Sequence, residues 1–247
     1  MLRFFRKIRQ QFFREQDFGK SVSPVNRYLF YAIGEIILVM IGILLALQVN
    51  TWNQKRIDAS KEKMVLLELK NDLEANLGIF ESSARWETNR VEGIKKIMQA
   101  MDAGQAWTDS FSLELKWQRH FEEFFIMSAT YNSLNSNGFD LISSDELRRG
   151  IIKLYDIIYK REGNRVDVIG KDLITTRENI FIKHTSWDLL KGVIVPNEPE
   201  KIAKNHELYN MLSLRLQTKG YAINFNNECS RATEELLELL NLYLEDF

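Results

Sequence analysis

The sequence predicts an all-α protein with a single N-terminal transmembrane helix that continues into a stalk, followed by an extracytoplasmic antiparallel helical bundle. An uninterrupted apolar run is long enough to cross a bilayer, and apolar residues recur at helical spacing through most of the remaining chain. No proline, which would break a helix, occurs between Pro24 and Pro196. These observations divide the chain into a basic cytoplasmic segment (1–27), the transmembrane helix (28–49), the stalk with the first bundle helix (50–104), and a helical extracytoplasmic domain (105–247).

The N-terminal segment has the pattern of a basic amphipathic helix. Seven basic and two acidic residues give residues 1–27 a net charge of +5, whereas 26 basic and 31 acidic residues give residues 54–247 a net charge of −5. Nucleic-acid binding is one interpretation of such a segment, but its closeness to the apolar run favours a membrane surface, where anionic lipid attracts basic side chains. The side chains expected to contact lipid are Arg3, Arg6, Lys7, Arg9 and Arg14.

The apolar run from Tyr28 to Val49 predicts a membrane anchor. It contains 22 residues and one charge, and as a helix it would be about 33 Å long. A cleaved signal peptide fits less well, because 27 polar and basic residues precede the run and no small-x-small cleavage site follows it. The excess of basic residues before the run predicts a cytoplasmic N-terminus and a C-terminal domain on the other side.

Glu35 is the one charged residue in the anchor. A carboxylate at that depth costs several kcal/mol unless it is neutral, paired or exposed to water. An ion path, a contact with another transmembrane helix and a carboxyl bent toward the headgroups remain alternatives. Gly34, Gly42 and Ala46 lie near the same helix face and would permit close approach of a second helix. We therefore predict that Gly34, Glu35, Gly42 and Ala46 mediate association.

After the anchor, helical spacing continues to about Ala103. A second helix is expected from about Leu113 to Asn137, where an aromatic stripe predicts a bundle core rather than a ligand pocket. Its side chains are Trp117, Phe121, Phe124, Phe125, Tyr131 and Leu134. Gly138 suits the C-terminal cap of this helix.

A third helix is expected from about Asp145, after a Ser-x-x-Glu capping box in residues 143–146. It reaches about Ile169, and either this helix or a new one continues to about Leu190. A loop at Lys191-Gly192 and two prolines follows, and a last helical region from about Lys201 to Glu245 is expected to be interrupted near Gly220.

The sequence contains no recognisable motif for catalysis, metal binding or nucleotide binding. His206-Glu207 resembles the start of the zinc motif HExxH, but position 210 is Asn210. The single cysteine, Cys229, cannot form an internal disulfide and is expected to be a buried apolar residue. We therefore expect no cofactor, no nucleic acid and no enzymatic activity.

Three strings carry a resemblance to a known family. They are RKIRQ at Arg6 to Gln10, YAIGEIILVMIGILLALQVNTWN at Tyr31 to Asn53, and TYNSLNSNGFDLISSDELR at Thr130 to Arg148. The chain resembles the family called domain of unknown function 6090. The resemblance implies a bacterial inner-membrane protein with a helical periplasmic region and no assigned activity.

Two functions fit these features. The first is a structural or interaction subunit of an inner-membrane or envelope assembly, bound to the lipid bilayer and associating with itself or with a membrane-protein partner. The second is a periplasmic ligand-binding or sensory module. Because 27 cytoplasmic residues are too few for a signalling domain, such a module would signal through a partner.

Overall fold

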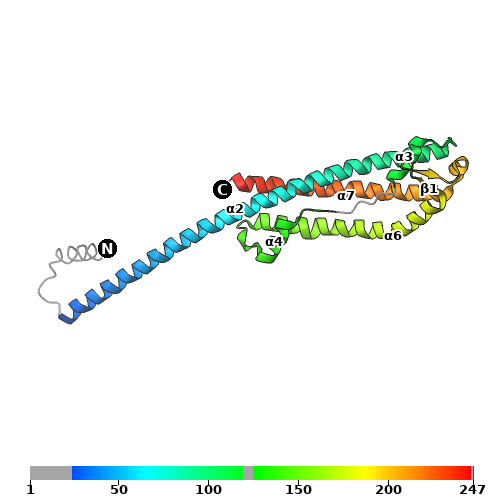
Figure 1. Ribbon diagram of the computed structural model, residues 1–247. Helices are drawn as coiled ribbons and strands as arrows, with labels where there is room; N and C mark the ends of the chain where they lie inside the picture. The colour runs from blue at the N-terminus through cyan, green and yellow to red at the C-terminus, as the bar shows by residue number, and fades with distance from the viewer. Residues whose placement is uncertain (1–23, 119–124, 246) are drawn as a thin grey trace. The chain divides into compact units, whose positions relative to one another are not determined.

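The protein, described by a computed structural model, divides into two units, residues 1–59 and residues 60–247 (Figure 1). The structure describes residues 24–118, 125–245 and 247, without the side chains of residues 24–27, 30, 31, 137 and 165–176. Helix α2, Pro24–Asp102, contributes residues to both units. The predicted lipid-contacting residues Arg3, Arg6, Lys7, Arg9 and Arg14 lie outside the described residues.

The first unit contains the apolar part of α2. Its most apolar window of 18 residues has a mean hydropathy of 2.4, and none of that window is buried within the structure. Ile36 and Leu44, for example, are 64% and 59% exposed. A helix in a soluble core would cover such side chains. This part of α2 is therefore long and apolar enough, and bare enough, to serve as a membrane anchor.

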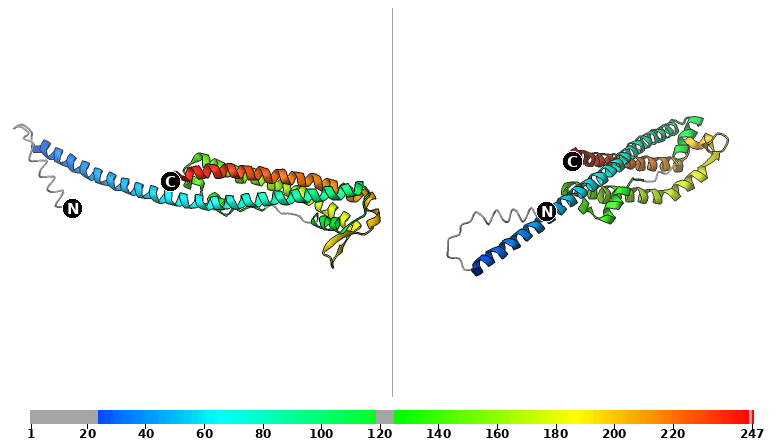
Figure 2. Two further views of the ribbon diagram at one scale, coloured as in Figure 1. Left: turned by 90° about the horizontal axis from the view of Figure 1, so that it is seen from above. Right: turned by 60° about the vertical axis from the view of Figure 1, so that its left-hand side comes forward.

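The second unit is a bundle of residues 60–102 of α2 with α6 (Lys160–His184) and α7 (His206–Glu245), as Figures 1 and 2 show. Shorter elements connect these helices. They are α3 (Asp109–Trp117), α4 (Ala129–Asn137), the 3-10 helix η1 (Phe139–Leu141), α5 (Asp145–Ile152), the π-helical segment η2 (Lys153–Tyr159), and the 3-10 helix η3 (Pro199–Lys204).

Contacts along the bundle define the helix directions. Hydrogen bonds join Tyr243 to Glu62 over 2.9 Å and Tyr209 to Asp102 over 3.3 Å, so α7 runs antiparallel to α2. The rings of Phe80 and Tyr159 lie 5.4 Å apart at one level, and Ile94 shares a core with Phe181 at the next level. Helices α2 and α6 therefore run in the same direction. The second unit is therefore not the fully antiparallel bundle that the sequence predicted, because α2 and α6 are parallel.

The second unit has two separate apolar cores. One lies toward the C-terminal end of α7 and includes Leu66, Phe80, Tyr159 and Leu240. Cys229 belongs to this core and is fully buried, as the sequence predicted. The other core lies toward the N-terminal end of α7 and includes Ile94. Charged side chains occupy the level of the bundle between the two.

The predicted single helix over residues 113–137 is wrong. The helices α3 and α4 are separate, and residues 125–128 between them are not helical. Asn76 of α2 holds this segment, because its Nδ2 donates to the carbonyl of Met127 over 2.9 Å and its Oδ1 accepts from the Met127 N–H over 2.6 Å. The carboxylate of Asp72 then accepts from the N–H of Thr130, in the first turn of α4, over 3.0 Å.

Two features near the start of α5 were predicted in outline. Gly138 does cap α4, with φ of +97°, and α5 begins at Asp145. The N-cap is Ser144, whose hydroxyl accepts from the N–H of Leu147. Ser143 instead donates both its N–H and its hydroxyl to the carboxylate of Glu62, over 2.7 and 2.8 Å.

A small hairpin replaces the end of the predicted third helix. Strands β1 (Thr185–Asp188) and β2 (Val193–Pro196) pair antiparallel, with Thr185 opposite Pro196. The Asp188 carboxylate accepts two backbone N–H groups of the turn, which also contains Gly192 with φ of +62°. The predicted interruption near Gly220 is also wrong, because α7 is continuous from His206 to Glu245.

Candidate functional site

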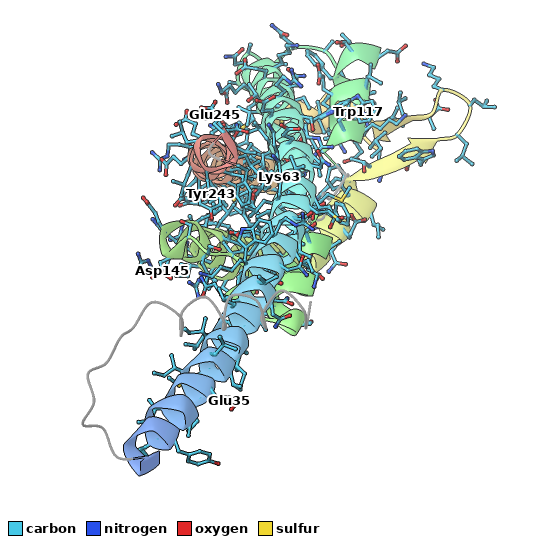
Figure 3. All side chains as sticks on the ribbon, turned by 90° about the vertical axis from the view of Figure 1, so that its left-hand side faces the viewer. Glu35, Lys63, Trp117, Asp145, Tyr243 and Glu245 are labelled. Carbon is cyan, nitrogen blue, oxygen red and sulfur yellow. The ribbon has the colours of Figure 1, made fainter. Side chains whose placement is uncertain are left out.

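The residues predicted to mediate association lie on the exposed surface of α2. Gly34, Glu35, Gly42 and Ala46 are all exposed. A Cβ atom added at Gly34 or Gly42 would meet no atom within 4 Å. Figure 3 shows the Glu35 side chain projecting from the helix. Among the described residues, this surface therefore has room for a second helix.

A layer of buried charges crosses the second unit between the two apolar cores. Helix α2 contributes Glu87 and Arg90, which are 3% and 8% exposed, and α6 contributes Arg177, which is 7% exposed. Helix α7 contributes Lys219, which is 7% exposed, and Arg215, which is partly buried. Charged side chains are rarely buried to this degree unless they are paired. We call these five residues the charged layer.

Helical spacing explains why these charges are buried. Glu87 lies seven residues after Phe80 and seven before Ile94, both of which are core residues. Lys219 likewise lies seven residues after Leu212, which is fully buried. Residues seven apart share one face of a helix. The signal was therefore present in the sequence, although none of these five charges was predicted to be buried.

The Glu87 carboxylate is the central acceptor of the layer. Its Oε1 accepts a hydrogen bond from Lys219 Nζ over 2.6 Å and one from Arg90 Nη1 over 3.3 Å. Arg177 donates through Nη2 to the neighbouring Glu178 over 3.1 Å. Four cationic side chains thus surround Glu87 and Glu178 in this part of the bundle, so among the described residues positive charge is in excess.

Burial changes the acid–base behaviour of two of these cations. It lowers the pKa of Lys219 to about 8, although Glu87 opposes the shift by stabilising the charged amine. It also lowers the pKa of Arg215 to about 10, with a further contribution from the nearby charge of Arg177. The interior therefore disfavours the positive charge that these groups carry at neutral pH.

A cavity of about 320 Å³ opens beside the layer, between α6 and α7. Arg177 and Arg215 are among its lining residues, together with the apolar residues Ile180, Met211 and Leu214. Asn210 and Glu207 complete the lining. The volume is at the lower end of the range for cavities that bind small molecules. The arrangement offers cationic donors beside an apolar surface.

The aromatic stripe is only partly a core. Tyr131 and Leu134 are buried, whereas Trp117 and Phe125 are 37% and 60% exposed, and Phe121 and Phe124 lie outside the described residues. Tyr131 stacks on Tyr155, with ring centroids 4.4 Å apart. With Tyr159, these two rings line a second cavity of about 300 Å³. Trp117 instead lies near Trp86, with ring centroids 6.3 Å apart.

Comparison with known proteins identifies a family but no characterised relative. No curated protein and no solved structure matches the chain. The sequence model of one family matches residues 35–179, more than half of the 247 residues. The match includes Glu35, Glu87 and Arg177, whereas Arg215 and Lys219 follow it. The chain therefore belongs to DUF6090, a family of unknown function, as the resemblance in its sequence indicated.

Proposed function

We propose that the chain is a membrane-anchored, non-enzymatic interaction subunit of an inner-membrane or envelope assembly, and that it self-associates through its anchor. The observation that carries this proposal is the bare apolar surface of α2, none of whose most apolar window is buried by the described residues. Gly34 and Gly42, eight residues apart, leave space for the backbone of a neighbouring helix. Glu35 lies beside this space and would be stabilised by a polar contact with that neighbour.

Native mass spectrometry of the full chain, extracted in a mild detergent, tests the assembly. We expect a defined oligomer that Gly42→Leu and Glu35→Leu each weaken, because the first blocks close approach and the second removes the polar contact. Leu44→Phe is the matched control, since it enlarges a side chain about 200° around the helix from Gly42. Unchanged assembly in both test variants would refute the interface, and a stoichiometric second protein would make the chain an accessory subunit.

The proposal includes a single-pass topology in the bacterial inner membrane, with a cytoplasmic N-terminus and a periplasmic C-terminal domain. The net charge of +5 on residues 1–27 supports it. Cys229 is fully buried and its pKa is raised to about 12, so the native thiol should not react. Glu235→Cys introduces an exposed thiol on α7. A membrane-impermeant maleimide should label this variant in intact spheroplasts, and labelling only after lysis would refute the orientation.

A second function, ligand binding by the helical bundle, is favoured by the cavity between α6 and α7. Its position beside the charged layer connects the cavity to residues of all three long helices. A ligand there would therefore stabilise the packing of the second unit. Fractions of a periplasmic small-molecule extract should raise the melting temperature (Tm) of the full chain, and a flat response across all fractions would count against this function.

A further inference from the structure

Arg177 and Arg215 line the cavity, and each has buried guanidinium donors for which the described residues supply no acceptor. Arg177 is 93% buried (7% exposed), and its Nε has no hydrogen-bond partner. Both Nε and Nη2 of Arg215 are buried without a partner as well. Unsatisfied buried donors are rare in native proteins, and each destabilises the fold. Two such side chains on one cavity indicate an acceptor that the described part of the chain does not supply.

The nearby carboxylates of Glu207 and Glu178 already accept hydrogen bonds. Glu207, at the cavity wall, accepts from Lys183 over 2.7 and 2.8 Å and contacts His184. The hydrogen bonds from Lys183 and His184 lower the pKa of Glu207, so it is ionised and engaged at neutral pH. Glu178 accepts from Arg177 Nη2, which leaves the Nε of that arginine unsatisfied.

Glu87 is the internal competitor for Arg215. Its Oε1 binds Lys219 and Arg90, whereas its Oε2 is buried and accepts no hydrogen bond. If Arg215 paired with this oxygen, its role would be structural, and removing its guanidinium would lower the stability of the ligand-free protein. If Arg215 instead binds a ligand, removing the guanidinium would leave that stability unchanged or raise it.

We propose that the cavity binds a small organic anion, whose carboxylate or phosphate group lies between Arg177 and Arg215 and whose short apolar portion packs on Ile180, Met211 and Leu214. Guanidinium groups suit both kinds of anion, because their planar donors match pairs of oxyanion oxygens. The excess positive charge of the layer would attract such a ligand, and binding would satisfy donors that are otherwise unpaired. This inference rests on the second function above and is independent of self-association by the anchor.

Thermal unfolding of the full chain in detergent tests the proposal, with sodium phosphate and sodium hexanoate as probes. Sodium chloride at equal ionic strength and hexanamide are the ligand controls. We expect at least one probe to raise Tm saturably, by about 5 °C at a hundredfold excess over its Kd. Phosphate alone would indicate a phosphate-bearing ligand, and hexanoate alone would indicate a carboxylate with an apolar tail.

Arg177→Met and Arg215→Met should each abolish the rise, and Arg215→Met should leave the Tm of the ligand-free protein unchanged or higher. Arg231→Met, at an exposed position of the same helix, is the matched control and should keep the rise. Absence of a rise with both probes, an equal rise in the two test variants, or a lower ligand-free Tm in Arg215→Met would overturn the proposal. If an extract fraction still stabilised the protein, the anion class would be wrong while ligand binding would stand.

Discussion

Lys219 on α7 donates a hydrogen bond to Glu87 on α2 over 2.6 Å, and both side chains are almost fully buried between two apolar cores. The pair connects positions 132 residues apart in the sequence. Burying two charges costs free energy that their attraction only partly offsets, and at Lys219 the cost of burial prevails, because its pKa is lowered although Glu87 is its partner. The stability of the second unit should therefore depend on the protonation of Lys219.

We predict that the second unit becomes more stable between pH 8 and 9. Burial lowers the pKa of Lys219 from 10.5 to about 8, so in this range the unfolded chain binds more protons than the folded one. Stability then rises as pH increases. The Lys219 amine contributes about 1 kcal/mol to this rise between pH 8 and 9, or about 2 to 4 °C in Tm. Circular dichroism melts at closely spaced pH values measure the slope.

Lys219→Met is the control, because it removes the titrating amine and should flatten the slope between pH 8 and 9. The charged groups that act on Lys219 are Glu87 and Arg90 from α2 and Arg215 on the same helix. Arg177 and Glu178 from α6 act on Arg215. The buried thiol of Cys229, whose pKa is raised from 9.0 to about 12, acts in the opposite sense, partly between pH 8 and 9 and fully above pH 9. An equal slope in wild type and Lys219→Met would contradict the prediction.

Removal of the charge on Glu87 should be strongly destabilising. Glu87→Gln keeps an oxygen that can accept from Lys219 but leaves the cations of the layer without their central carboxylate. We expect a loss of about 3 kcal/mol in the free energy of unfolding at pH 7. Urea titration of the full chain measures it. Glu92→Gln is the comparison, because its 2.8 Å pair with Lys95 is exposed and should contribute less than about 1 kcal/mol.

Asn76 should determine the conformation of residues 125–128. It is fully buried and bonds both backbone groups of Met127, so Asn76→Ala removes the partner of the Met127 N–H and leaves the carbonyl with only the Tyr155 hydroxyl, at 3.2 Å. We expect a loss of about 3 kcal/mol and faster hydrogen exchange at the Met127 amide. Asn71→Ala, at an exposed position of the same helix, should change neither quantity. Unchanged exchange at Met127 in Asn76→Ala would show that other contacts fix this segment.

Local patterns predicted the elements whose causes are local. The apolar spacing of α2, the glycine at position 138 and the serine-rich start of α5 each depend on residues within a few positions of one another. The break between α3 and α4 depends instead on Asn76, which lies 51 residues from Met127. Helical spacing in residues 113–137 was real, but it could not reveal this long-range partner.

The hairpin and the charged layer had signals in the sequence that were not used to predict them. Val193, Ile194 and Val195 are β-branched and precede Pro196, which is typical of a short edge strand. Glu87 and Lys219 occupy the same helical spacing as their buried neighbours. Charged residues are normally solvated, so this spacing alone does not predict that they are buried. The cavity could not be predicted, because it depends on how α6 and α7 pack.

Two glycine substitutions should have opposite effects on stability. Gly138 has φ of +97°, a conformation that side chains other than glycine rarely adopt, so Gly138→Ala should destabilise the second unit by about 1 to 3 kcal/mol. Gly220 lies inside α7, where a Cβ would meet no atom within 4 Å. Gly220→Ala should therefore stabilise the helix by about 0.5 to 1 kcal/mol. Urea unfolding of both variants against wild type measures the difference. Destabilisation by Gly220→Ala would indicate that α7 is interrupted there after all, because only a non-helical backbone at that position would need glycine.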